Sequence, residues 1–336
     1  MDWFGASQAQ EYGPAKWALG QRSDAASDAD VERSFADGTI LRTHVLRPTW
    51  HFVLPADIKW MLELTGPRVL AQSASYYRRQ GLDEATLERS NTVLERALRG
   101  GNHVMRKELK EVLEKSGIEA EGYRLPFIIM NAELRGLICS GPRRGQQHTY
   151  ALLEERAPNA RVLDPEESLA ELTLRYFTSH GPATIKDFAW WSSLKVVDIK
   201  RGLEMVGAQL TVEEIDGVQF WFADAPSVPE TASPKVALLQ TFDEYVVAYR
   251  DSRSVIDASG LARPHDATYL LGDALVLDSQ KVGTWKRTMK WDEVLIAAEL
   301  YLHLDDTQRR ALHESASEYA DFLGLRSSIE APVIAS

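Results

Sequence analysis

Residues 137–153, LICSGPRRGQQHTYALL, predict a β-hairpin. The apolar runs 137–140 and 148–153 have the composition of strands, and the loop between them, GPRRGQQ (141–147), contains Pro142 and two glycines, which form turns. Three segments with apolar residues at helical spacing precede this hairpin. Three helices followed by a hairpin are the element order of a winged helix. The helical segments are residues 83–101, 106–118 and 125–138.

The same order recurs on both sides of this segment, with a period of about 80 to 100 residues. Downstream, three helical segments precede two strands around Asp216-Gly217, a dipeptide typical of tight hairpins. Upstream, two helical segments precede two strands around Pro48, so this copy lacks its first helix. The downstream elements are residues 165–181, 184–194, 196–207, 210–215 and 218–223; the upstream ones are 15–22, 28–38, 39–47 and 49–54.

These patterns predict an α+β protein with three tandem winged-helix domains and a small C-terminal β-rich unit. Two helices, 55–66 and 67–81, connect the first two domains, and the proline-rich segment PSVPETASP (226–234) precedes the last unit. The predicted divisions are 1–54, the first winged helix without its N-terminal helix; 55–82, the helical connector; 83–158, the second winged helix; 159–225, the third; and 226–336, the β-rich unit with a closing helix.

Composition restricts the class of protein. The 336 residues are 44% hydrophobic, enough for a substantial core, and a formal net charge of −11 excludes a surface that is basic throughout. A single cysteine, Cys139, excludes an internal disulfide and suits a reducing compartment. The chain begins without a basic leader and contains no apolar run of membrane-spanning length, so we expect the cytoplasm and no membrane partner.

Two predicted wings contain no acidic residue in this acidic chain: residues 38–54 and 134–153. Arginine and amide side chains on a hairpin can donate hydrogen bonds to phosphate oxygens while the ribbon enters a DNA groove. An arginine pair in a turn can equally be a solvated surface feature. The candidate DNA contacts are Arg42, His44, Arg47, His51, Arg143, Arg144 and Gln147.

Motifs for other chemistry are missing from the sequence. It contains no GxxxxGK[ST], no GxGxxG after a strand, no GxSxG, no HExxH and no paired cysteines, so we expect no nucleotide hydrolysis, no nicotinamide or other nucleotide cofactor, no serine hydrolase and no structural zinc. His44 and His51 lie on facing predicted strands and could approach each other, but without a third ligand a packed pair is the better interpretation than a metal site. The segment FAWW (188–191) could stack on bases, although a core role is expected in a helix.

The segment SQAQ (7–10) places Gln8 and Gln10 on either side of one alanine. Ser7 and Gln10 have the spacing of a capping box, in which both side chains satisfy backbone N–H groups at a helix start. On a helix, residues two apart point about 200° away from each other, whereas in extended backbone they share a face. Gly13-Pro14 disfavours a helix running through this segment, so the amides could either cap a turn or act together.

Several segments together resemble the AlkZ/YcaQ-like winged-helix DNA glycosylases, over nearly the whole chain. In that family the catalytic signature is a glutamine, a mostly apolar residue, then glutamine or aspartate, and Gln8-Ala9-Gln10 matches it. Family members carry a helix before the signature that this sequence does not show. Besides the hairpin, the similar segments are WFGASQAQEYGPAKWALGQR (3–22), LRTHVLRPTWHFVLP (41–55), SHGPATIKDFAWWSSL (179–194), TFDEYVVAYRDS (241–252) and KVGTWKR (281–287).

The resemblance implies a DNA glycosylase of base-excision repair that removes bulky N7-alkylated purines from double-stranded DNA and, in some members, unhooks interstrand crosslinks. It implies catalytic roles for Gln8 and Gln10 without cofactor or metal, and a cytoplasmic enzyme at the nucleoid. An amide is no base near neutral pH but can orient water, and N7 alkylation makes the purine a good leaving group. Three tandem winged helices need no partner subunit, so we expect a monomer. The alternative is a non-catalytic winged-helix DNA-binding protein or regulator.

Overall fold

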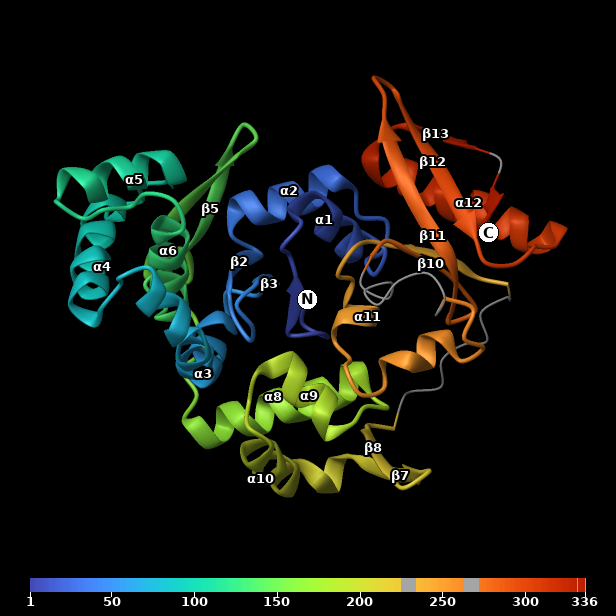
Figure 1. Cartoon of the computed structure of the whole chain (residues 1–336), viewed down its shortest axis with the longest axis horizontal. Helices are drawn as coiled ribbons and strands as arrows, with labels where there is room; N and C mark the ends of the chain where they lie inside the picture. Colours follow the sequence, from blue (N-terminus) through green and yellow to red (C-terminus); the bar gives the residue numbers. More distant parts are fainter. Residues whose placement is uncertain (225–233, 263–271, 331, 336) are drawn as a thin grey trace. The chain divides into compact units, whose positions relative to one another are not determined.

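The computed structural model describes residues 1–224, 234–262, 272–330 and 332–335 (Figure 1). Of the predicted linker 226–234, only the last residue falls within these ranges. The chain divides into two compact units, one of residues 1–9 and 33–223, the other of residues 10–32 and 224–336. Helices and sheets occur in both units, which confirms the mixed α+β class. In the part of the chain that is described, no helix is long and apolar enough to cross a membrane.

The first unit begins with a small antiparallel sheet in which β3 is the middle strand, in the order β1-β3-β2. Its strands are β1 (Ala6–Gln8), β2 (Leu41–His44) and β3 (Trp50–Val53). The predicted hairpin of β2 and β3 is therefore joined by a third strand from the start of the chain, in register Ala6↔Val53, Ser7↔Phe52 and Gln8↔His51. Consequently β1 carries Gln8 onto the sheet.

A single helix, α3 (Ile58–Arg79), replaces the two connector helices predicted from the sequence. Pro67 lies inside it, although proline removes one backbone hydrogen bond from a helix interior. The helix continues because both of its halves are packed: Trp60 and Met61 before Pro67, and Val69 after it, are fully buried. Tertiary packing thus outweighs the local signal of proline.

The second predicted winged-helix segment shows the expected order of helices followed by a hairpin. Leu94, Leu109, Leu113 and Ile128 belong to one buried core, and Asp83 caps the first helix by accepting from the Thr86 N–H at 2.8 Å. The hairpin stands beside the helices (Figure 1). Its elements are α4 (Glu84–Leu98), β4 (Val104–Met105), α5 (Arg106–Lys115), α6 (Arg124–Leu134), β5 (Ile138–Arg144), β6 (Gln147–Leu152) and α7 (Leu153–Arg156), with sheet order β4-β6-β5.

The third segment repeats that order with a two-stranded sheet. A capping box of Asp164 and Glu167 starts its first helix. The rings of Tyr176 and Phe188 stack at 4.6 Å, and Phe188 and Trp191 are fully buried, so these two aromatic residues of FAWW form core, as expected. The elements are α8 (Pro165–His180), α9 (Ile185–Ser192), α10 (Val196–Val206), η1 (Gly207–Gln209), β7 (Thr211–Ile215) and β8 (Val218–Phe222).

The second unit is built on a larger sheet of order β13-β12-β11-β10-β9, with β14 paired to β12. Helix α1 of the predicted first domain belongs to this unit, where the Trp17 indole N–H donates to the Leu238 carbonyl at 2.8 Å and Arg22 pairs with Asp243 at 2.5 Å. Residues 1–54 are therefore divided between the units. The elements are α1 (Tyr12–Gly20), α2 (Asp28–Asp37, continuing into the first unit), β9 (Val236–Leu239), α11 (Glu244–Val247), η2 (Arg253–Asp257), β10 (Ala274–Leu277), β11 (Gln280–Met289), β12 (Glu293–Leu300), α12 (Asp306–Leu323), β13 (Arg326–Ile329) and β14 (Val333–Ile334).

Candidate active site around Gln8

Gln8 lies in extended backbone at the end of β1, and only 4% of it is exposed. The capping-box interpretation is wrong: Ser7 pairs with Phe52 inside the sheet, and the next helix starts at Tyr12 with Glu11 at its N-cap. Directly opposite residues of neighbouring strands point to the same face, so Gln8 shares a face with His51. Gln8 is thus a buried amide on a sheet, available for chemistry that a helix cap would preclude.

Arg47 connects Gln8 to His51. Its Nη2 donates to Gln8 Oε1 at 2.8 Å and lies 3.2 Å from His51 Nε2. His51 Nδ1 lies 2.9 Å from the Thr49 carbonyl oxygen, which can only accept. Nδ1 therefore carries the ring proton, and the lone pair of Nε2 accepts from Arg47. The hydrogen bonds thus run outward from Arg47, to the Gln8 amide oxygen on one side and through His51 to the Thr49 carbonyl on the other.

The residue between the two glutamines is held through its backbone. The Ala9 N–H donates to the Trp50 carbonyl at 2.7 Å, and Arg42 Nε donates to the Ala9 carbonyl at 3.0 Å. The Arg42 guanidinium also lies 4.5 Å from the centre of the Trp50 ring, a cation–π contact. Both backbone polar groups of Ala9 are therefore hydrogen-bonded to residues of the first unit.

A buried carboxylate holds the other face of the sheet. Glu133, on α6 and completely buried, contacts His44 Nδ1 through Oε2 and accepts from Trp50 Nε1 through Oε1 at 3.3 Å. The rings of His44 and Trp50 lie 4.3 Å apart. Sequence reasoning missed Glu133; the available signal was a carboxylate within an otherwise apolar helical segment.

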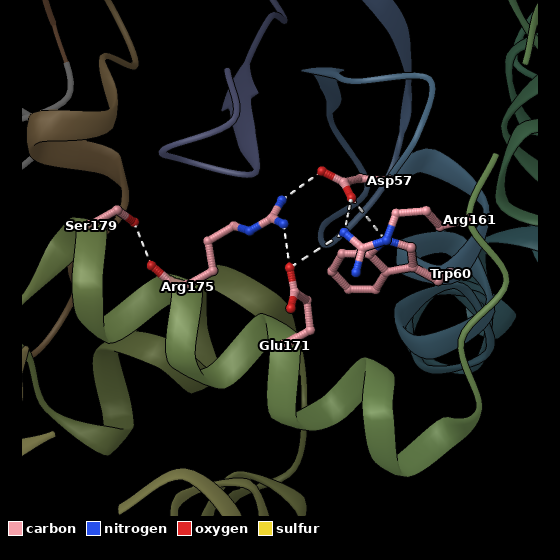
Figure 2. Close-up of polar contacts among 6 residues, drawn as sticks. All are labelled: Asp57, Trp60, Arg161, Glu171, Arg175 and Ser179. Carbon is pink, nitrogen blue, oxygen red and sulfur yellow. Dashed lines mark hydrogen bonds and ion pairs between the residues drawn. The ribbon is translucent and has the colours of Figure 1, made fainter. Parts of the chain in front are cut away.

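An ion-pair network lies against the residue that precedes β1 (Figure 2). Arg175 donates to Asp57 at 2.6 Å and to Glu171, and Arg161 contacts the same two carboxylates at 3.2 and 3.6 Å. Burial alone would lower the pKa of Arg175. The hydrogen bond and negative charge of Asp57, and to a smaller extent those of Glu171, raise this pKa above its usual value. A Cβ on Gly5 would lie 3.0 Å from Arg175 Cδ, and Gly5 has a φ of +77°, so glycine is required where the chain enters β1.

Gln10 follows in a bend and is exposed, as the first residue of the second unit. That the two glutamine side chains share a face stays a prediction. Gln8 is fixed by the sheet and by Arg47, whereas Gln10 lies outside the strand.

The model of the DNA glycosylase AlkZ-like family matches residues 1–322. The chain belongs to this family. An interstrand DNA cross-link repair glycosylase of Streptomyces sahachiroi is 26% identical over 302 residues, which span 83% of this chain and 79% of that protein. The solved structure of the Streptomyces sahachiroi DNA glycosylase AlkZ is similar at a TM-score of 0.78 and 21% identity, covering 98% of this chain and 92% of that one. The predictions of the family and of a DNA glycosylase, a hydrolase of N-glycosyl bonds, are confirmed.

In this AlkZ-like chain the predicted DNA contacts fall into two groups. Arg42, His44, Arg47 and His51 are 0–6% exposed, where a solvent-facing wing was expected. The difference arises because charge patterning does not reveal that β1 and Glu133 pack on the first hairpin. Their contact with DNA stays a prediction.

The second group lies on the β5–β6 hairpin and reaches solvent. Arg144 is exposed, pairs with Glu108 at 2.9 Å and donates to the His103 carbonyl at 2.7 Å, while Gln147 is exposed opposite it. The Met105 N–H, and after it Arg144, lower the pKa of Glu108. Arg143 is half-buried beside them and lines a pocket of about 510 Å³ between the turn end of the hairpin and residues 101–104. This hairpin presents the arginine side chains that a phosphate could reach.

His44 and His51 do not form a joint metal site. His51 is opposite Thr43 and His44 is opposite Trp50, so the two imidazoles point to opposite faces of the sheet. Among the residues described, no three histidine, cysteine or acidic side chains gather in a way that could hold a metal ion. Both imidazoles instead bond within the protein, His44 to Glu133 and His51 to Thr49.

Proposed function

We propose that this AlkZ-like protein is a monofunctional DNA glycosylase for bulky N7-alkylated purines in double-stranded DNA, with Gln8 and Gln10 positioning the attacking water. The observation that carries the proposal is the extended, buried placement of Gln8, which is not part of a helix cap. The relative named for interstrand cross-link repair adds the unhooking of such crosslinks to the proposed activity.

The reaction suits residues that orient water without deprotonating it. The water oxygen attacks C1′ while the C1′–N9 bond breaks. The electron pair of the C1′–N9 bond goes to the purine and neutralises its positive charge. The attacking water loses its proton to solvent. Amides contribute hydrogen bonds and dipoles to this oxocarbenium-like transition state but no base near neutral pH. An undamaged purine is a neutral leaving group that requires protonation, so unmodified DNA is a poor substrate.

We assign DNA binding to the winged-helix domains. In the second domain the β5–β6 hairpin supplies the main phosphate contacts, Arg143, Arg144 and Gln147. A bulky adduct resists insertion into a closed pocket, so an open cleft along the groove is expected. Three winged helices in one chain supply this surface without a partner subunit, and the proposed enzyme works as a monomer at the nucleoid.

The test is base release from duplex DNA that contains N7-methylguanine, measured for wild type, Gln8→Ala, Gln10→Ala and the double variant. We expect the double variant to lose release by about 100-fold or more, in line with removal of transition-state hydrogen bonds. Undamaged duplex and sodium borohydride trapping are controls, and neither product nor trapped enzyme is expected. Equal release by wild type and double variant would remove the glutamines from the mechanism and leave a DNA-binding protein.

A further inference from the structure

We infer that Arg47, itself oriented by His51, is a positioning residue that fixes the amide of Gln8 in one of its two flip states. The inference rests on the proposed role of Gln8. A guanidinium can only donate hydrogen bonds, so the Gln8 atom 2.8 Å from Arg47 Nη2 must be the amide oxygen. The Gln8 amide nitrogen therefore points away from Arg47.

Burial makes this orientation firm. Gln8 and Arg47 are 4% and 6% exposed, so water has little access to replace the hydrogen bond between them. Turning the amide by 180° would place N–H groups against N–H groups and leave buried donors without an acceptor, which is unfavourable. The amide thus has one favoured state before any substrate is present.

His51 determines where the guanidinium lies. It is fully buried on the middle strand, and its Nδ1–H is committed to the Thr49 carbonyl at 2.9 Å. Its Nε2 can therefore only accept, and it faces Arg47 Nη2 at 3.2 Å. The same nitrogen of Arg47 thus donates to a ring on β3 and to an amide on β1, which are adjacent strands in direct register.

This role differs from the phosphate contact expected from the sequence, and the two make opposite predictions. A phosphate contact affects DNA affinity and its salt dependence. A positioning residue affects the rate of base release while affinity stays the same, and its effect depends on the presence of Gln8. Supporting residues of this kind typically change activity by about 10–100-fold.

The experiment measures single-turnover release of N7-methylguanine and duplex affinity at several salt concentrations for wild type, Arg47→Met, Arg47→Lys, Gln8→Ala and Gln8→Ala with Arg47→Met. Arg144→Met, at a proposed phosphate contact, is the comparison variant and should show the opposite pattern, a weaker affinity with a smaller salt slope. We expect Arg47→Met to slow release by about 10–100-fold with affinity and salt slope unchanged. Arg47→Lys retains a hydrogen-bond donor, so its release rate should lie between those of wild type and Arg47→Met. In the Gln8→Ala background, Arg47→Met should cause no further loss of release rate.

Each failure has its own signature. Wild-type release by Gln8→Ala would overturn the proposed function, whereas slow release by Gln8→Ala together with normal release by Arg47→Met would overturn only the positioning role. The positioning role would also be overturned if Arg47→Met slowed release as much in the Gln8→Ala background as in wild type. A weaker and less salt-dependent DNA affinity of Arg47→Met would overturn it too. If Arg47→Met does not fold by circular dichroism, the Arg47→Lys variant, with and without Gln8→Ala, decides by the same criterion.

Discussion

His44 on β2 hydrogen-bonds through Nδ1 to Oε2 of Glu133 on α6, a residue 89 positions later in the chain. The second oxygen of Glu133 accepts from the Trp50 indole, so one carboxylate holds both strands of the first hairpin. Through this contact the sheet that carries Gln8 is attached to the helices of the following segment. The geometry of the candidate site therefore depends on a residue far from the glutamines in sequence.

Removing that carboxylate should destabilise the protein. Glu133→Ala removes the acceptor of the buried His44 imidazole and of the half-buried Trp50 indole, and we expect the free energy of unfolding to fall by about 2–5 kcal/mol. Urea unfolding followed by circular dichroism measures it. The control is Glu111→Ala on α5, which removes an exposed carboxylate and should stay within about 0.5 kcal/mol of wild type. Equal stability of the two variants would show that Glu133 does not hold the hairpin.

Close packing of α3 on α6 gives a second prediction. A Cβ on Gly66 would lie 2.5 Å from the Leu134 carbonyl oxygen, so the two helices would have to separate. We expect Gly66→Ala to lower the free energy of unfolding by about 1–3 kcal/mol. Gly207→Ala is the matched control, because nothing lies within 4 Å of its added carbon, and its thermal midpoint should match or exceed wild type. A wild-type midpoint for Gly66→Ala would contradict the packing described.

Arg143 and Arg144 of the β5–β6 hairpin give a prediction for DNA binding. Arg143→Ala with Arg144→Ala should weaken duplex affinity for all sequences and reduce the slope of log affinity against log salt by about 1–2. Fluorescence anisotropy at several salt concentrations measures both. Arg201→Ala tests position, since its side chain is 51% exposed against 53% for Arg144 and it lies on α10. Arg144→Ala alone should weaken affinity more than Arg201→Ala, and an equal effect of these two single variants would assign binding to net charge.

The single cysteine reports on unfolding. Cys139 is fully buried, and burial raises the pKa of its thiol to about 12, so at pH 8 the folded protein holds it protonated and inaccessible. We expect a thiol reagent to label it at the rate of unfolding, and much faster in urea. Ser116→Cys in a Cys139→Ala background places a thiol on an exposed position and should react at once. Equal rates for Cys139 with and without urea would contradict its burial.

The raised pKa of Cys139 also determines how stability changes with pH. The folded-state pKa of Cys139 lies above the ordinary thiol value, so its contribution to stability is complete below about pH 8.5 and is lost as pH rises toward 12. Comparing the pH dependence of unfolding for wild type and Cys139→Ala isolates this contribution. A difference that grows below pH 8 would contradict the assignment.

Local signals predicted much of the fold. The helices predicted to start at residues 83 and 165 begin at Glu84 and Pro165, and Asp216-Gly217 makes the turn between β7 and β8. Each of these depends on residues a few positions apart. The family was predicted from several sequence segments that resemble its members, together with Gln8-Ala9-Gln10, and this prediction is confirmed.

The surroundings of the site could not be predicted in this way. A strand of three residues such as Ala6–Gln8 has no periodicity, and its pairing with β3 depends on residues more than 40 positions away. Arg42 donates to Ala9, 33 positions away, and Arg47 donates to Gln8, 39 positions away, so an acid-free hairpin suggested exposed cations where the structure buries them. Likewise, Trp17 donates to the Leu238 carbonyl, 221 positions along the chain, in the predicted C-terminal β-rich unit.

The hydrogen-bonded backbone of Ala9 has a consequence for substrate binding. Trp50 and Arg42 hold its N–H and its carbonyl in the protein without DNA. A flexible loop would lose conformational entropy when it ordered around a lesion, which would weaken binding and slow the approach to the reactive geometry. The backbone beside Gln8 has already lost that freedom during folding, so the free energy of DNA binding need not be reduced by ordering it.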